Sequence, residues 1–176
     1  YTNPLIPADF PDPDVIFVDG TYYMVSTTMF VFPGVTILQS KDLVNWEYCS
    51  NAVPRFDFSP CYDLNGCHRY SHGQWATSMR YHNGKYLLLF ITLDEGGFLC
   101  TAEKAEGPWE IEKLPKGFYD PGMFFDDDGR NYVVHGYSNI LITEVNENFE
   151  AVDKDSLVFT GDIRKGLEGA HVYKIN

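Results

Sequence analysis

The chain of 176 residues contains no long apolar run and few basic residues. No uninterrupted apolar stretch approaches the ~20 residues of a membrane span, so a transmembrane helix is not expected. Lysine and arginine together number 13 against 25 acidic residues, which gives a formal net charge of −12. This charge repels nucleic acid phosphates and anionic lipid headgroups over a Debye length of about 8 to 10 Å. Nucleic acid and membranes are therefore poor partners, whereas a neutral carbohydrate substrate is compatible.

Paired metal-binding cysteines are also missing. The four cysteines are Cys49, Cys61, Cys67 and Cys100, and none of them forms a CxxC pair. A zinc site therefore has no spacing to support it. Cys61 and Cys67 share a polar loop, and the cysteine count fits a small disulfide and free thiols equally well.

Amphipathic helical periodicity is absent as well, and short β-branched and aromatic runs separated by Gly, Asn and Asp predominate. Three hairpins stand out around Gly20, Gly84 and Gly129. Each has a DG, NG or DDDG turn followed by a Tyr-led apolar strand. Turns of this type are the strongest short-range signal for a β-hairpin. The chain is therefore predicted to be all-β.

A unit of four strands recurs along the chain. Each hairpin is followed by two more predicted strands with an aromatic residue near their end: Trp46, Trp109 and Phe149 in turn. The hairpin glycines lie 64 and 45 residues apart, and four strands in roughly 40 to 50 residues are typical of a propeller blade. Meanders in a β-sandwich have a similar rhythm, but the recurring aromatic residue favours blades. Residues 168–176, EGAHVYKIN, are predicted to open a fourth unit in its first strand.

Acidic residues stand at corresponding places in these units. Asp12 and Asp120 each precede a proline, Glu168 precedes a glycine, and the second unit has Trp75 and Ala76 at this place. A following proline predicts an extended backbone for Asp12. Because the first strand of every blade lines the central channel of a propeller, we expect these carboxylates to converge beside an indole. Turn capping or cation binding is the alternative role, but one protonated and one ionised carboxyl group are what glycoside hydrolysis requires.

A set of ordered motifs resembles glycoside hydrolase family 43. The motifs are FPDPDV, TTMFVFPGVTILQSKDLVNW, QWATSMRYHNGKYLLLF, YDPGMFFDDDGR and LEGAHVYK. The resemblance implies a five-bladed β-propeller, of which residues 1–176 supply about three blades and the start of a fourth. They would form the N-terminal portion of a single catalytic domain and, without the remaining blades, are expected to be inactive alone. The implied enzyme is an inverting glycosidase that removes terminal arabinofuranosyl or xylosyl residues from plant cell-wall polysaccharide or oligosaccharides.

The resemblance also implies a role for each acid. Asp12 matches the general base, Glu168 the general acid, and Asp120 the residue that orients the acid and raises its pKa. The residues alone do not choose between Asp12 and Asp14, which lie two positions apart on one side of a strand, and the resemblance selects Asp12. For inversion the base and acid carboxyl groups are expected to lie roughly 6.5 to 9.5 Å apart, with room for a water.

Further residues are predicted to contact the sugar. Trp75 either stacks on it or fills the channel wall, and Phe32 is predicted to shape the glycone pocket. Arg69 belongs to a 24-residue insertion from Asn51 to Gln74 that we expect to influence substrate specificity. A solvated surface loop is the alternative interpretation of this insertion.

No cofactor is required by this chemistry and no metal ligands are predicted, although the sequence leaves open a calcium ion in the central channel. The chain begins at Tyr1 without Met or an apolar leader. This start indicates the removal of a signal peptide or upstream segment and favours a secreted or periplasmic protein.

Two other functions compete with this interpretation. A sugar-binding propeller that has lost catalysis would lack an acid or a base, whereas all three expected carboxylates are present. A fructan-cleaving propeller hydrolase would carry an Asn-Asp-Pro-Asn motif, from which Phe-Pro-Asp-Pro-Asp departs.

Overall fold

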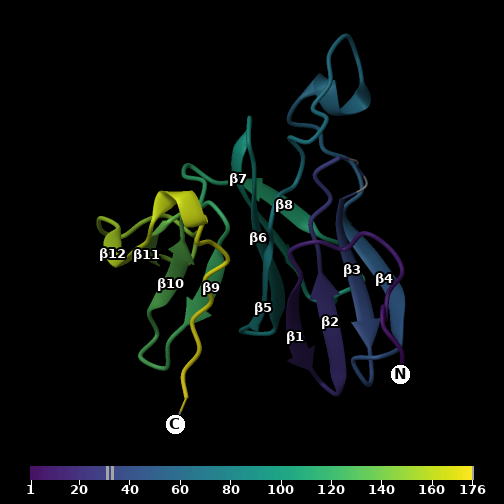
Figure 1. The fold of residues 1–176 in the computed structure, drawn as a ribbon, viewed down its shortest axis with the longest axis horizontal. Coiled ribbons are helices and arrows are strands. Elements are labelled where there is room, and N and C mark those ends of the chain that lie inside the picture. The colour runs from purple at the N-terminus through teal and green to yellow at the C-terminus, as the bar shows by residue number, and fades with distance from the viewer. Residues whose placement is uncertain (31, 33, 176) are drawn as a thin grey trace.

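In the computed structural model, residues 1–30, 32 and 34–175 are described, and they form three four-stranded antiparallel sheets (Figure 1). The first sheet contains β1 (Asp14–Val18), β2 (Thr21–Val25), β3 (Gly34–Ser40) and β4 (Trp46–Val53). The second contains β5 (Ser78–His82), β6 (Lys85–Thr92), β7 (Gly96–Ala102) and β8 (Glu110–Lys113). The third contains β9 (Gly122–Phe125), β10 (Asn131–His135), β11 (Asn139–Val145) and β12 (Ser156–Thr160). Short 3₁₀ helices cover Pro60–Asp63 and Ile163–Lys165. The predicted all-β class and the predicted four-strand units are confirmed.

The hairpin turns follow the local sequence. Asp19 and Gly20 join β1 to β2 with φ of 47° and 76°, and Asn83 and Gly84 join β5 to β6 with φ of 50° and 80°. Two consecutive residues with positive φ are the requirement of a type I′ turn, whose twist matches that of the flanking strands. Asp, Asn and Gly are the residues that accept this conformation most readily.

The sheets are arranged as propeller blades, with their first strands side by side at the centre (Figure 1). β1 contacts β5, and β5 contacts β9. Within every sheet the strands follow in chain order, so each sheet is a meander that runs outward from the centre. The segments that enter β1, β5 and β9 are therefore brought close together, although they are far apart in the sequence.

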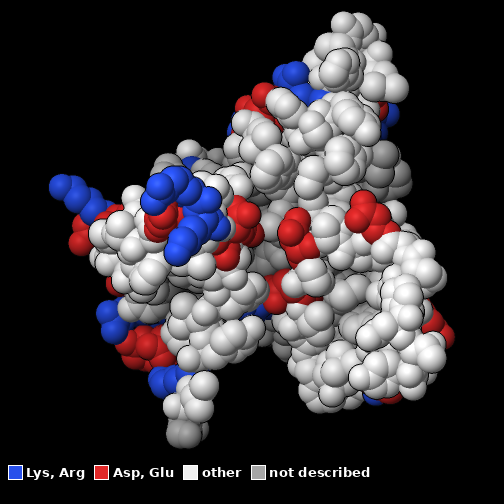
Figure 2. Space-filling model, viewed as in Figure 1, with Lys and Arg blue, Asp and Glu red and all other residues white. Residues whose placement is uncertain are grey.

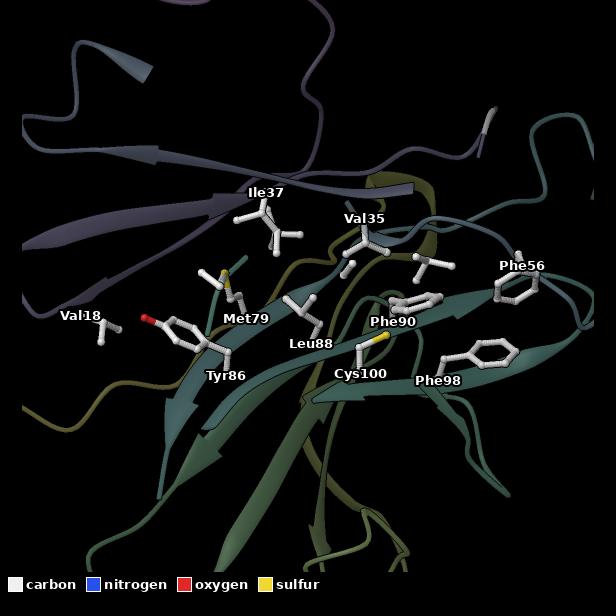
Figure 3. Close-up of a cluster of buried hydrophobic side chains, with 14 residues drawn as sticks. Val18, Val35, Ile37, Phe56, Met79, Tyr86, Leu88, Phe90, Phe98 and Cys100 are labelled. Atoms are coloured by element: carbon white, nitrogen blue, oxygen red, sulfur yellow. The ribbon is translucent and has the colours of Figure 1, made fainter. Parts of the chain in front are cut away.

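Apolar side chains fill the spaces between neighbouring sheets. Figure 3 shows the cluster between the first two sheets, where Val35 and Ile37 of β3 meet Leu88 and Phe90 of β6. A second cluster joins the second sheet to the third and includes Leu89. Alternate side chains of β6 thus pack against different sheets, which explains why its sequence KYLLLFIT is an almost continuous apolar run.

Two of the three predicted aromatic residues take part in this packing. Trp109 packs against the cluster between the first and second sheets. Phe149 is buried in the cluster between the second and third sheets. Trp46 begins β4 and is half-buried, and its indole Nε1 donates to the carbonyl of Leu43 at 3.2 Å.

Two predicted boundaries are wrong. Asn51, Ala52 and Val53 belong to β4, so the insertion starts at Pro54; Asn51 pairs with Thr36 of β3. Within residues 166–175 the structure has no strand, because no described segment supplies a ladder partner. This stretch instead packs as an irregular segment against the third sheet, and Leu167 accepts a hydrogen bond from the amide of Ser138 at 2.7 Å. Among the described residues, no helix has the length and apolar character needed to cross a membrane.

Candidate active site

The segments that enter the first strands place the predicted acids around one pocket. It has a volume of about 80 Å³, and Asp12, Asp120, Glu168 and Trp75 line it together with Met29, Ala76, Ile91 and Tyr119. We call this site the acid pocket. Figure 2 shows carboxylates gathered near the centre of this face, where the sheets meet. Asp12, Ala76 and Asp120 each lie two residues before their first strand, which is the correspondence that the sequence predicted.

Asp12 is held in an unusual backbone conformation. The expectation of an extended backbone before Pro13 is wrong, because Asp12 has φ of 49°. Asp120 also precedes a proline and has φ of 50°. Positive φ is uncommon outside glycine, although Asp tolerates it better than most residues, and such strain persists only where the surroundings impose it. Asp12 and Asp120 thus share the same positive-φ conformation, and each lies just before the first strand of its own sheet.

The end of β2 holds the Asp12 segment in place. The carbonyl of Pro11 accepts hydrogen bonds from the Thr27 amide at 3.1 Å and from the Ser26 hydroxyl at 2.6 Å. The Thr27 hydroxyl donates to Oδ2 of Asp12 at 2.9 Å. The register that pairs Asp14 with Val25 places Thr27 opposite Asp12, so the predicted hairpin could have identified this partner.

Glu168 reaches the pocket on the irregular segment that follows the third sheet. The Tyr119 hydroxyl donates to Oε2 of Glu168 at 3.1 Å. The backbone amide of Gly169 donates to the carboxylate of Asp120. Gly122 allows this segment to lie close to β9, because a Cβ on Gly122 would overlap the carbonyl oxygen of Ala170.

Electrostatic repulsion is concentrated on Asp120. Burial raises the pKa of Asp120 above its usual value, and the negative charges of Glu168 and Asp12 raise it further, while the Gly169 amide and His171 oppose the shift. Burial and the hydrogen bond to Glu168 raise the pKa of Tyr119 to about 12, so Tyr119 stays a hydrogen-bond donor at neutral pH. The acid pocket therefore holds closely spaced carboxylates with few compensating cations, an arrangement typical of functional sites.

Trp75 contributes an aromatic wall to the pocket. Its amide donates to the carbonyl of Ile91 at 3.0 Å, and its indole Nε1 donates to the carbonyl of Ser71 at 3.2 Å. Its ring lies 6.2 Å from that of Tyr119. Gln74, which sequence reasoning missed, is completely buried beside it and accepts from the amide and hydroxyl of Thr28 at 2.8 and 2.7 Å.

Phe32 and Arg69 lie elsewhere. Both line a neighbouring pocket of about 70 Å³, which shares Met29 with the acid pocket. Phe32 stacks on Phe56 with ring centroids 4.9 Å apart. Arg69 pairs with Asp94 at 3.0 Å and with Glu95 at 3.2 Å. In the described structure these two side chains therefore anchor the insertion and do not line the acid pocket.

Asp14, the competing candidate, has a different environment. It is buried, and its Oδ2 accepts from the Met79 amide at 2.8 Å and from Nη1 of Arg80 at 2.7 Å. Arg80 also donates through Nε to the carbonyl of Met123 at 3.0 Å and through Nη2 to Nδ1 of His171 at 3.3 Å. Asp14 and Arg80 thus tie the first strands of all three described sheets together. Within the described residues, no group of three or more His, Cys, Asp or Glu side chains is arranged to hold a metal ion.

Comparison with known proteins identifies the family of this chain. The sequence profile of glycosyl hydrolases family 43 matches residues 1–176. The chain belongs to this family. It is 32% identical to a beta-xylosidase of Formosa agariphila, covering 100% of this chain and 32% of the relative. It is 31% identical to a non-reducing end alpha-L-arabinofuranosidase of Bacteroides ovatus, covering 99% of this chain and 34% of the relative.

Solved structures of the family share the fold of this chain. The bifunctional GH43-CE protein of Bacteroides eggerthii superposes with a TM-score of 0.90 at 33% identity, covering 99% of this chain and 24% of that protein. The family 43 chain described here spans about a third of the length of the curated relatives it matches.

Proposed function

We propose that this family 43 chain carries the catalytic acids of an inverting glycosidase that removes terminal arabinofuranosyl or xylosyl residues from plant cell-wall polysaccharide or oligosaccharides. The observation that carries the proposal is the acid pocket, where Asp12, Asp120 and Glu168 meet beside Trp75. The names of the relatives, a beta-xylosidase and an arabinofuranosidase, support the two sugars.

In the proposed reaction Asp12 takes a proton from a water as the water attacks the anomeric carbon. Glu168 gives its proton to the departing glycosidic oxygen, so the bond to the leaving group breaks as the bond to water forms. Tyr119 orients Glu168 through its hydrogen bond. Asp120 lies close enough to interact electrostatically with both Asp12 and Glu168.

We further propose that these sheets belong to a five-bladed propeller. The outer strand β12 supports packing of another sheet, because its apolar side chains Leu157, Val158 and Phe159 are 61%, 60% and 52% exposed. We also propose that the protein is secreted or periplasmic. The disulfide between Cys61 and Cys67 supports this location, because such bonds persist in oxidising compartments.

The test is hydrolysis of 4-nitrophenyl arabinofuranoside and xyloside by the full-length protein that contains these residues. Asp12→Asn and Glu168→Gln are each expected to lower kcat by about 10²- to 10⁴-fold. Glu168→Gln should lose less on the nitrophenyl glycosides than on a disaccharide, because nitrophenolate leaves without protonation. NMR of the first sugar released should show the inverted anomer.

Matched controls are Asp9→Asn and Glu147→Gln, since both side chains are exposed and lie outside the acid pocket. The controls should keep full activity. Undiminished turnover in either pocket variant would refute the assignment of that acid, and wild-type protein that binds pentosides without cleaving them would indicate a binding propeller.

A further inference from the structure

An exposed pair of aromatic rings lies beside the acid pocket. Phe30 follows the first hairpin and Tyr70 comes from the insertion, and their ring centroids are 5.1 Å apart with the planes tilted by 42°. Phe30 is 45% exposed and Tyr70 is 66% exposed. We call this pair the aromatic platform. Figure 1 shows that the insertion between β4 and β5 projects beyond the sheets on the side where the first strands begin.

The platform is continuous with the acid pocket. Phe30 and Tyr70 line the neighbouring pocket, and Met29 lines both that pocket and the acid pocket. The backbone links the two sites as well, because the Gly73 amide donates to the carbonyl of Met29 at 2.9 Å. A ligand that extends out of the acid pocket past Met29 therefore meets the platform rings.

The insertion that carries Tyr70 is built as a fixed support. A disulfide joins Cys61 to Cys67. The Tyr62 hydroxyl donates to Oε2 of Glu95 at 2.5 Å, and the Tyr62 ring packs edge-on against Phe56 of the core. A Cβ on Gly73 would lie 2.8 Å from the carbonyl oxygen of Met29, so the return of the loop depends on this glycine.

The surroundings of the platform favour an uncharged ligand. Two carboxylates that contact the insertion, Asp94 and Glu95, are engaged by Arg69, and His72 contacts Asp94 at 2.8 Å. Because these charges are paired with one another, the exposed rings are the principal feature that this surface offers to a ligand. Aromatic faces that stay exposed beside a polar pocket are suited to the apolar faces of sugar rings, which stack on them without charge pairing.

We propose that the aromatic platform binds the sugar units next to the terminal residue, so that Phe30 and Tyr70 determine the preference for oligosaccharide over short substrates. The proposal rests on the proposed hydrolysis of terminal pentosides and adds to it the part of the substrate that leaves. Phe30 and Tyr70 act in binding and take no part in proton transfer.

The experiment compares Phe30→Ala and Tyr70→Ala with wild-type protein on two substrates of the preferred sugar. One is a linear tetrasaccharide, and the other is the pentosyl fluoride, whose leaving group is a single atom. Each variant is expected to raise KM for the tetrasaccharide by about 3- to 10-fold and to leave kcat/KM for the fluoride within about twofold. Tyr70→Trp should retain the wild-type KM because it keeps an aromatic face. Tyr48→Ala is the matched control, since Tyr48 is 62% exposed on β4 and lines neither pocket.

A binding measurement separates this proposal from the proposed function. Calorimetry in an Asp12→Asn background should show that Tyr70→Ala weakens tetrasaccharide binding by the same factor and leaves binding of the free pentose unchanged. If the wild-type protein hydrolyses no pentoside but this difference persists, the platform stands and the hydrolytic function fails. Equal losses on both substrates, or no loss on the tetrasaccharide, would overturn the platform.

Discussion

Two clusters of charged groups lie at the centre of the molecule, and they differ in how their charges are compensated. In the first cluster the carboxylate of Asp14 accepts hydrogen bonds from the guanidinium of Arg80 at 2.7 Å and from the amide of Met79 at 2.8 Å. In the acid pocket Asp12 accepts one hydroxyl, from Thr27, and faces the negative Asp120. Asp12 and Asp14, which belong to different clusters, are only two positions apart in the sequence.

The difference separates carboxylates whose charge is compensated within the fold from those that the proposed function uses. A buried carboxylate with a cation and a backbone donor is satisfied, and its loss leaves the partners unpaired. Closely spaced carboxylates without a cation cost stability, and burial with like-charge repulsion shifts their proton affinity toward values useful in catalysis. Asp14 belongs to the first class, and Asp120, whose pKa is raised by burial and by its acidic neighbours, belongs to the second.

The largest effect is expected from removing the cation of the compensated cluster. Arg80→Met should lower the free energy of unfolding by about 3 to 5 kcal/mol, because Asp14 would remain buried and charged without its partner. Denaturant unfolding measures this loss. The double variant Asp14→Asn with Arg80→Met should recover part of the stability, and a single variant as stable as wild type would show that Asp14 needs no cation.

A smaller effect is expected at Gly122, which lies next to the Arg80 partner Met123 and against the segment that carries Glu168. Gly122→Ala would place a Cβ against the carbonyl of Ala170 and displace the segment that carries Glu168. We expect a loss of about 1 to 3 kcal/mol in stability from this overlap. Gly122→Ala should lose more activity than Gly129→Ala. Gly129 is a hairpin glycine with positive φ, but the space around its Cβ position is open. Comparing kcat and melting temperature of the two variants tests the prediction.

Ser78→Ala should cost about 1 to 2 kcal/mol. The Ser78 hydroxyl accepts from the buried Met123 amide at 3.0 Å and links β5 to β9, and alanine would leave that amide without its acceptor. Ser78→Thr keeps the hydroxyl and serves as the comparison in denaturant unfolding. If alanine and threonine variants unfold at the same denaturant concentration, the hydroxyl does not link the strands.

The smallest effect has the opposite sign. Because the pKa of Asp120 is raised in the folded state, ionisation of Asp120 disfavours folding. The stabilisation that the raised pKa of Asp120 gives to the folded state is complete at pH values below the pKa of Asp120 in the unfolded chain. It is lost as the pH rises through the pKa of Asp120 in the folded state. Asp120→Asn should therefore raise the melting temperature at pH 7 by about 2 to 4 °C, with little gain near pH 3.5. Activity should fall in the same variant, and a variant less stable at pH 7 than wild type would contradict the electrostatic argument.

Much of the site could be predicted from the sequence because its signals are local. The DG and NG turns identified the hairpins, and the spacing of the units put Asp12, Asp120 and Trp75 at corresponding places. Register extension from the first hairpin also identifies Thr27 as the neighbour of Asp12. The Arg80 contacts could not be predicted, because they join three strands through long side chains whose directions depend on packing between sheets.

The sequence by itself determined the strands, their turns and the order in which the acids enter the sheets, since these depend on short-range backbone preferences and side-chain alternation. Only the tertiary structure decided that Asp14 is neutralised by Arg80, that Asp12 adopts positive φ before a proline, and that Phe32 and Arg69 support the insertion beside the acid pocket. Those outcomes depend on contacts between residues far apart in the chain. The free energy of such contacts is set by which neighbours exclude water and supply charge, and no local pattern records this.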